Sequence, residues 1–339
     1  MNAKRELTSA TIALLATLAL GSALMLIVQR GPGHVWLEMA ARVLDDPARI
    51  GQVLYRATAL ALTALAVSVA LDAGLFNIAG EAQLAAGVLA CAVVGAALPA
   101  ATPWPIAIPL CCLAAASAGG AIGALIGIAR VTRGAHEVIT SIMLNEIVGA
   151  VVLWLGNTFL FENGTTTGPA IVGGARLPQF VTGSSANLAI IVAAAALAAT
   201  WWIRARTTWG VALRAVGRDP AAARAVGISV GRVQIAAMTI GGALAGLAAI
   251  DFVLGDRHAY EEGLGRGFGF VGLSAALLGR LEPAGIAVAS LVLGFLSVGG
   301  LAVSDLVPKE LPEMLQGIIV IAIAIAVPWT RKRMLRRPA

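Results

Sequence analysis

The sequence predicts an all-α polytopic membrane protein with about ten transmembrane helices. Three observations support this: 59% of the 339 residues are hydrophobic, only 12% are charged, and the mean hydropathy is +0.88. Soluble domains carry roughly 25% charged residues, and a chain with half that share cannot cover its surface with polar groups. The net charge of +6 does not indicate nucleic-acid binding, because the basic residues gather at the ends of apolar runs. The bilayer is the expected solvent.

Ten apolar runs are long enough to be considered as spans, since a bilayer core about 30 Å thick needs about 20 mainly apolar residues per helix. The runs at 80–98 and 268–280 are short and interrupted by glycine, so broken or re-entrant helices are expected in both halves of the chain. The ten runs are 9–28, 53–71, 80–98, 106–129, 138–160, 187–203, 233–254, 268–280, 284–303 and 312–328.

The distribution of Lys and Arg predicts the orientation, because positive residues near span ends stay in the cytoplasm. Ten spans with both termini cytoplasmic place 16 of the 24 positive residues inside. Residues 161–186 and 255–267 then form external loops, and residues 204–232 form a basic cytoplasmic loop. We expect the whole chain, 1–339, to be one transmembrane domain.

The basic loop is expected to hold a short helix. Asp219 suits the N-cap, Pro220 suits the first helical position, the alanines of 221–225 favour the helix, and Gly227 ends it. A short helix exposed between two spans is a surface on which a partner can dock. The alternative is a solvated basic linker.

The sequence does not supply the residues of common enzyme sites. A P-loop needs a lysine directly after glycine, and none of the three lysines follows one. His136-Glu137 begins like a zinc-binding helix, but position 140 is Thr instead of His. We therefore expect neither an enzymatic activity nor a bound metal.

A few polar side chains lie within the apolar runs, where charged groups are costly and usually face a bundle interior or a water-filled path. They gather in the glycine-interrupted segment 74–87, two turns into the fifth span, and near the external end of the seventh, while one phenylalanine lies beside the second interrupted segment, 263–272. We interpret them as lining a path, with helix capping or polar packing between helices and subunits as the alternative. The candidate path residues are Asn77, Glu81, Gln83, Asn145, Glu146, Asp251 and Phe268.

Four segments in order, over roughly residues 50–330, resemble the permease subunits of bacterial ATP-binding-cassette (ABC) importers for nucleosides, ribose-like sugars and branched-chain amino acids. GLFNIAGEAQ at 74–83 is similar to the family's GLFNIGAEGQ, and HEVITSIMLN at 136–145 to its NEVI-TLMLN. RAVGRDP at 214–220 with AVGI at 225–228 follows the pattern RAVG-NP-AA--AGI. The last third matches in GGALAG at 241–246, ALLGR at 276–280 and LQG at 315–317.

The resemblance implies a subunit of the bacterial inner membrane that supplies half of a translocation path. A separate ATPase subunit would bind ATP and Mg²⁺, a second, homologous permease would complete the path, and an external solute-binding protein would deliver the solute; this chain itself would bind no cofactor. It also implies that the segment 214–228 is the coupling helix that docks on the ATPase. The residues so assigned are Arg214, Gly217, Arg218, Asp219, Pro220, Ala222, Arg224 and Gly227.

The first three motifs are most similar to nucleoside-type permeases, so import of nucleosides, with purine nucleosides favoured, is the main prediction. These motifs depart from the family pattern in several places: Ala79-Gly80 shifts a glycine by one position, Ala82 replaces a glycine, and His136 replaces an amide with an imidazole. Import of ribose-like monosaccharides is the alternative. Two further alternatives are a proton-coupled secondary transporter that uses Glu81, Glu146 or Asp251, and a multi-span scaffold.

Overall fold

The structure is a computed structural model that describes residues 22, 31–161, 165–306, 314 and 317. The predicted spans 9–28 and 312–328 therefore lie almost entirely outside the described residues. Among the described residues, seven helices are long and apolar enough to cross a membrane, and each coincides with one of the predicted spans. They are α3 (Pro47–Asp72), α4 (Gly80–Ala97), α5 (Trp104–Arg133), α6 (Glu137–Leu155) with the π-helix Gly156–Leu160, α7 (Ala189–Arg206), α10 (Val230–Leu247) with α11 (Ala249–Phe252) and the π-helix Val253–Arg257, and α13 (Pro283–Ala302).

The remaining described elements are short and connect these helices. They are α2 (Pro32–Leu44), β1 (Thr167–Ala170), the 3₁₀ turn Gly173–Ala175, α8 (Thr208–Arg218), α9 (Pro220–Ala225), β2 (Ala259–Glu261) and α12 (Phe268–Leu278). β1 and β2 pair antiparallel, with Thr167 opposite Glu261 and Ala170 opposite Ala259. This small sheet ties the predicted loop 161–186 to the predicted loop 255–267.

One expectation from the sequence needs correction. The interval 268–280 is not a complete span, because its helix α12 has 11 residues and rises only about 16 Å at 1.5 Å per residue. The segment before the first described span holds a helix that was not predicted, α2, which has Pro32 in its first turn. The sequence pattern missed α2, since at 13 residues it is too short to register as a span.

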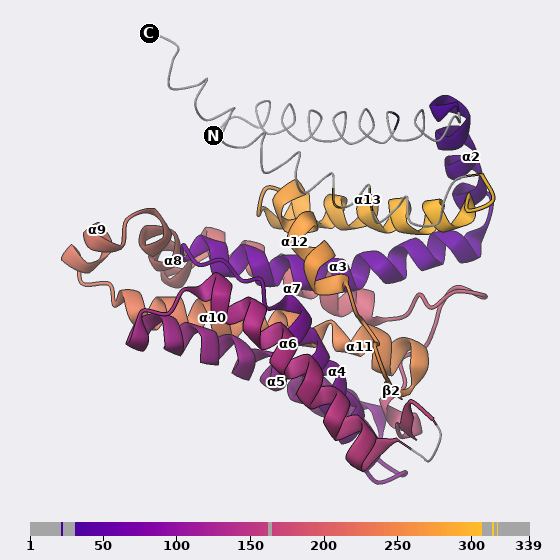
Figure 1. Cartoon of the computed structure of the whole chain (residues 1–339), viewed down its shortest axis with the longest axis horizontal. Helices are drawn as coiled ribbons and strands as arrows, with labels where there is room; N and C mark the ends of the chain where they lie inside the picture. The colour runs from indigo at the N-terminus through magenta and orange to yellow at the C-terminus, as the bar shows by residue number, and fades with distance from the viewer. Residues whose placement is uncertain (1–21, 23–30, 162–164, 307–313, 315–316, 318–339) are drawn as a thin grey trace.

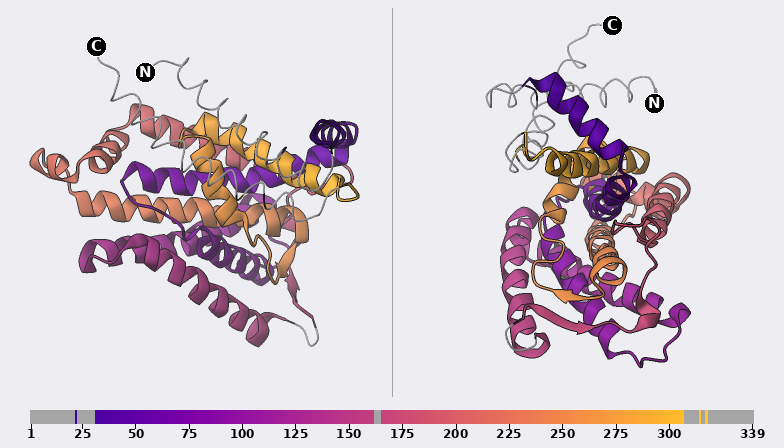
Figure 2. Two further views of the ribbon diagram at one scale, coloured as in Figure 1. Left: turned by 45° about the horizontal axis from the view of Figure 1, so that its top comes forward. Right: turned by 90° about the vertical axis from the view of Figure 1, so that its right-hand side faces the viewer.

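The bundle has two distinct ends (Figure 1). At one end lie α8 and α9 together with the ends of α5 and α7, which carry Arg130, Arg133, Arg204 and Arg206 in their last turns; we call it the basic end. At the opposite end lie α2 and the β1–β2 pair (Figures 1 and 2); we call it the ribbon end.

Helix α3 forms the centre of the bundle. Asp46 caps its N-terminus at the ribbon end by accepting a hydrogen bond from the Ala48 N–H, and Pro47 occupies the first helical position. From there α3 runs for 26 residues, about 39 Å, to Asp72 at the basic end, and nearly every residue from Ala57 to Ala70 is buried. A helix that is apolar on all sides needs other helices around it, and α7, α10, α12 and α13 pack against α3.

Exposed tryptophans mark both ends of the outer helices. Trp104 begins α5 and Trp154 lies near the end of α6, while Trp201 and Trp202 lie near the end of α7 at the basic end. Tryptophan is enriched where hydrocarbon meets headgroups. Their placement agrees with a bundle that spans a bilayer from the basic end to the ribbon end.

Glycine allows α5 and α10 to pack with their backbones in contact. A Cβ at Gly123 would lie 2.1 Å from the Met238 carbonyl oxygen, and a Cβ at Gly246 would lie 2.3 Å from the Ala115 carbonyl oxygen. Association of helices in lipid relies on such close packing, because lipid tails already solvate apolar side chains. Gly242 and Gly246 of GGALAG thus pack α10 against α5.

We expect Gly123→Ala to lower the thermal stability of the purified protein, since the added methyl group meets backbone that cannot move aside. Overpacking of this kind costs about 2 kcal/mol. The matched control is Gly149→Ala, because no heavy atom lies within 4 Å of the position of its Cβ. A melting curve followed in detergent gives the comparison, and equal melting temperatures for the two variants would contradict the packing account.

Candidate functional site

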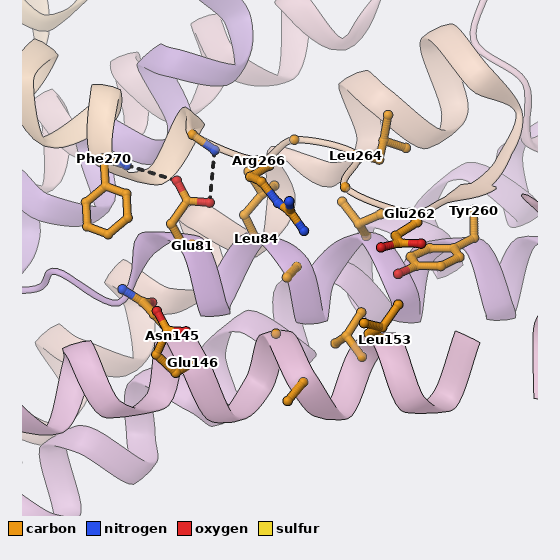
Figure 3. A pocket seen from close by; sticks show the side chains of 18 residues that line it. Glu81, Leu84, Asn145, Glu146, Leu153, Tyr260, Glu262, Leu264, Arg266 and Phe270 are labelled. Atoms are coloured by element: carbon orange, nitrogen blue, oxygen red, sulfur yellow. Dashed lines mark hydrogen bonds between the residues drawn. The ribbon is translucent and has the colours of Figure 1, made fainter. Parts of the chain in front are cut away.

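A cleft of about 570 Å³ opens between α4, α6 and the segment 260–270. Its inner end is formed by Glu81, Asn145, Glu146 and Phe270, and its outer end by Leu153 and Tyr260 (Figure 3). Val88, two turns along α4 from Glu81, lines it as well. Because Glu81 and Val88 are seven residues apart on one helix, the cleft extends for about 10 Å. It lies in the half of the bundle that is nearer the ribbon end.

The inner end lies near the middle of the bundle, where two helices begin. The Thr63 hydroxyl donates a hydrogen bond to the carbonyl oxygen of Phe268, the first residue of α12, and Thr63 lies about 14 Å along α3 from Asp72. A Cβ at Gly80, the first residue of α4, would lie 3.0 Å from the Gly269 Cα. The N-termini of α4 and α12 therefore meet at mid-depth, and both helices are broken ones that start inside the bundle.

Glu81 caps the N-terminus of α12. Its carboxylate accepts hydrogen bonds from the backbone N–H groups of Gly267, Gly269 and Phe270, at 3.1, 2.9 and 3.2 Å; Figure 3 draws those from Gly267 and Phe270. The first N–H groups of a helix have no partner within it, and leaving them unpaired away from water is costly. The Glu81 carboxylate pairs these N–H groups, and its negative charge lies at the positive end of the helix dipole, which is a favourable position.

Amide side chains complete the junction at the start of α4. Asn145 of α6 accepts a hydrogen bond from the Ala82 N–H (3.0 Å) and donates one to the Ile78 carbonyl (3.1 Å). Asn77 and Gln83 exchange two side-chain hydrogen bonds of 3.1 Å, and Asn77 also accepts one from the Ala79 N–H. Of these, Asn145 lines the cleft, whereas Asn77 and Gln83 are buried behind it.

Two of the predicted path residues lie elsewhere. Asp251 is fully buried in α11, where its Oδ1 accepts a hydrogen bond of 2.8 Å from Asn187, and its Oδ2 has no partner among the described residues. Phe268 packs edge-to-face with Phe252, with ring centroids 5.0 Å apart, and the Arg56 guanidinium lies over the Phe268 ring, 6.0 Å from its centroid. Neither residue lines the cleft.

The predicted helix in the basic loop is present as α9. Asp219 caps it by accepting hydrogen bonds from the N–H groups of Ala221 and Ala222, and Gly227 adopts the left-handed φ of +85° just after its end. α8 and α9 project together from the basic end (Figure 1). Arg218, Ala222 and Arg224 are exposed on this projection, and Arg214 is half-buried at its base.

Gly217 joins this projection to the rest of the bundle. A Cβ at Gly217 would lie 2.2 Å from the carbonyl oxygen of Asp72 and 3.1 Å from the Gly74 nitrogen. Gly74 itself has a φ of +75°, with the Leu75 N–H donating back to the Ala70 carbonyl. The last turn of α8 thus rests on the turn from which the chain re-enters the bundle toward Asn77 and Glu81.

A buried ion pair fastens the same turn to two further helices. Arg204 of α7 contacts Asp72 at 2.9 Å and also donates to the Leu281 carbonyl between α12 and α13, which the Ser68 hydroxyl approaches at 2.6 Å. Both charged side chains are about nine-tenths buried. Removing one member of such a pair leaves a buried charge and is strongly destabilising, so α3, α7 and the α12–α13 turn are held as a unit.

The sequence did not single out several residues that the structure brings to the cleft. Tyr260, Glu262 and Arg266 line it, and they lie in or just before the glycine-interrupted segment 263–272. The charged residues beside this break in an apolar run could have been used to predict that the segment faces a cleft. Which face of the segment meets α6 is decided by the turn at Gly263, Gly265 and Gly267, all with positive φ.

Comparisons with known proteins agree with this architecture. The family model described as branched-chain amino acid transport system, permease component, matches residues 49–324. The guanosine ABC transporter permease protein NupP of Bacillus subtilis (strain 168) is 34% identical, covering 92% of this chain and 91% of the relative. The nucleoside ABC transporter permease protein NupB of Lactococcus lactis subsp. cremoris is 30% identical over 96% and 92%. The glucose ABC transporter permease protein TsgB13 of Haloferax volcanii is 30% identical over 91% and 85%.

The match to the family covers all the described spans and the α8–α9 projection. Its members are components of transporters and not enzymes. This chain is therefore an integral membrane protein that belongs to the family of ABC transporter permeases described as the branched-chain amino acid transport system permease component.

Proposed function

We propose that this chain is a permease subunit of an ATP-driven importer of nucleosides, with purine nucleosides favoured, in a bacterial inner membrane. The observation that carries the proposal is the cleft that leads from the ribbon end to the capped junction at mid-depth. The similarity to the guanosine permease NupP and the nucleoside permease NupB supports the substrate class.

The basic end faces the cytoplasm in this proposal, because the last-turn arginines of α5 and α7 lie there. The full topology then has ten spans with both termini inside, counting 9–28 and 312–328. α4 and α12 with their preceding segments each make one broken crossing. The β1–β2 pair faces outward, where a solute-binding protein would dock.

The α8–α9 projection is the docking site for a cytoplasmic ATPase that holds ATP and Mg²⁺. Motion of the projection would reach the cleft through the Gly217–Gly74 contact and the segment that leads to Glu81. Such a rigid chain of contacts lets ATP binding exchange outward-facing and inward-facing states. A second, homologous permease would cover the open side of the cleft and supply the other half of the path.

A monosaccharide importer is the second candidate, and the similarity to the glucose permease TsgB13 favours keeping it. A proton-coupled transporter is less well supported. Of its three candidate carboxylates, Glu81 is committed to the cap of α12 and Asp251 is buried away from the cleft.

Uptake of radiolabelled guanosine, with ribose as competitor, tests the proposal in cells that carry this chain with its partner genes. We expect uptake that needs ATP and falls at least tenfold in the variant Arg218→Glu with Arg224→Glu, because both charges face the docking surface. The control is Arg133→Glu, an exposed arginine of the same end outside the projection. Uptake that survives both the double variant and removal of the ATPase would overturn the importer assignment.

The Gly217 contact predicts an uncoupled variant. In Gly217→Ala the new methyl group meets the Asp72 carbonyl, so the projection must shift, and overpacking of about 1–3 kcal/mol would favour one transport state. We expect the ATPase to co-purify normally while guanosine uptake falls about tenfold. Gly33→Ala, at the ribbon end with open space around it, is the control. Unchanged uptake in Gly217→Ala would show that the contact between Gly217 and Asp72 does not transmit motion of the projection to the cleft.

Asp251→Asn separates ATP-driven from proton-coupled transport. Asparagine can still accept the hydrogen bond from Asn187 and removes a carboxylate oxygen that has no partner among the described residues, so we expect uptake within about twofold of wild type, well below the effect of breaking a buried hydrogen bond. Asp251→Leu removes the side-chain acceptor of the Asn187 amide in a buried position and should lower the yield of folded protein. A folded Asp251→Asn protein without uptake would favour the proton relay.

A further inference from the structure

The polar groups at the inner end of the cleft are not equally available to a solute. The Glu81 carboxylate is occupied by three N–H groups of α12, and both ends of the Asn145 amide are bonded to the start of α4. Asn77 and Gln83 lie behind the cleft and bond to each other. These groups hold the junction together.

Glu146 is different, because it makes no hydrogen bond or ion pair with any of the described residues. Its side chain is exposed and lines the inner end of the cleft. It lies nine residues into α6, about 14 Å from the start of that helix, so it sits at bilayer depth. An ionised side chain there is costly unless it faces water, a partner or a solute.

Phe270 lies at the same inner end, on the first turn of α12 (Figure 3). Its backbone N–H is fixed by Glu81, whereas 51% of the residue is exposed. A large aromatic ring that is held by its backbone and left uncovered offers a flat face to a ligand. Phe268, two residues earlier, is already in contact with the Phe252 ring and the Arg56 guanidinium.

We propose that Glu146 and Phe270 are the pair of side chains in this subunit that contacts the solute, which rests on the proposed function. Phe270 supplies a face on which a nucleobase stacks, and the Glu146 carboxylate accepts two hydrogen bonds from adjacent donors. Two parts of a nucleoside offer such donors: the N–H groups on the edge of guanine and the vicinal hydroxyls of ribose. The solute class is thus an uncharged nucleoside.

The test compares initial rates of ATP-driven uptake into proteoliposomes that hold the complete transporter, with guanosine, adenosine and 2′-deoxyguanosine as substrates. The same solute-binding protein serves every variant, so a changed ratio between substrates reports this chain. We expect Glu146→Gln to raise KM about tenfold for the substrates that use it, since a charged acceptor is lost. Phe270→Leu should raise KM about tenfold for all three, as stacking is tolerant of base identity.

The Glu146→Gln pattern distinguishes the two sources of donors. A higher KM for guanosine and 2′-deoxyguanosine, with the KM for adenosine unchanged, identifies the N–H groups on the base edge as the donors. A higher KM for guanosine and adenosine, with the KM for 2′-deoxyguanosine unchanged, identifies the ribose hydroxyls. An equal rise in KM for all three substrates, or no rise for any of them, would overturn the role of Glu146. Unchanged KM values in Phe270→Leu would overturn the role of Phe270.

Matched controls carry the same chemical changes elsewhere. Glu38→Gln alters a carboxylate on α2, and Phe180→Leu alters a half-exposed phenylalanine near the ribbon end. Both should keep wild-type KM values. If the wild-type transporter takes up none of the nucleosides, the proposed function itself fails; if it takes them up and the variants do so equally well, only the assignment of Glu146 and Phe270 fails.

Discussion

The need to satisfy backbone N–H groups where two helices begin inside a membrane bundle governs this structure. α4 and α12 start at mid-depth, where their first N–H groups cannot reach bulk water. Glu81 satisfies those of α12, and Asn77 and Asn145 satisfy those at the start of α4. Gly80 and Gly269 permit the two starts to approach to backbone contact. The inner end of the cleft exists because this junction is closed by side chains of the chain itself.

The same junction is linked to the basic end by a short and well-fixed segment. Asp72 ends α3 and pairs with Arg204, Gly74 turns the chain back, and Gly217 of α8 lies against both. The residues from Gly74 to Gln83 therefore contact the α8–α9 projection at one end and cap or enter the broken helices at the other. A displacement of α8 has a direct mechanical route to the floor of the cleft, without passing through the outer helices.

Two carboxylates at bilayer depth illustrate how tertiary structure assigns roles to similar residues. Glu81 and Glu146 both line the inner end of the cleft. Three N–H donors make Glu81 a structural cap, whereas Glu146 has no hydrogen bond or ion pair with any of the described residues and is the carboxylate for which we propose a contact with the solute. Burying a polar group is costly unless it is paired, so the paired groups define the frame and the unpaired one points to the path.

The sequence by itself determined the membrane class, the seven described spans, the broken helices in both halves of the chain and the capped helix α9. It could do so because the length of an apolar run, glycine and N-cap residues act locally. It also placed Glu81, Asn145 and Glu146 in one candidate set. Only the tertiary structure decided that α12 is half a span, that Asp251 and Phe268 lie away from the cleft, and that Phe270 faces it. Those outcomes depend on which residues far apart in the sequence meet across helices, and hydropathy along one chain carries no information about such contacts.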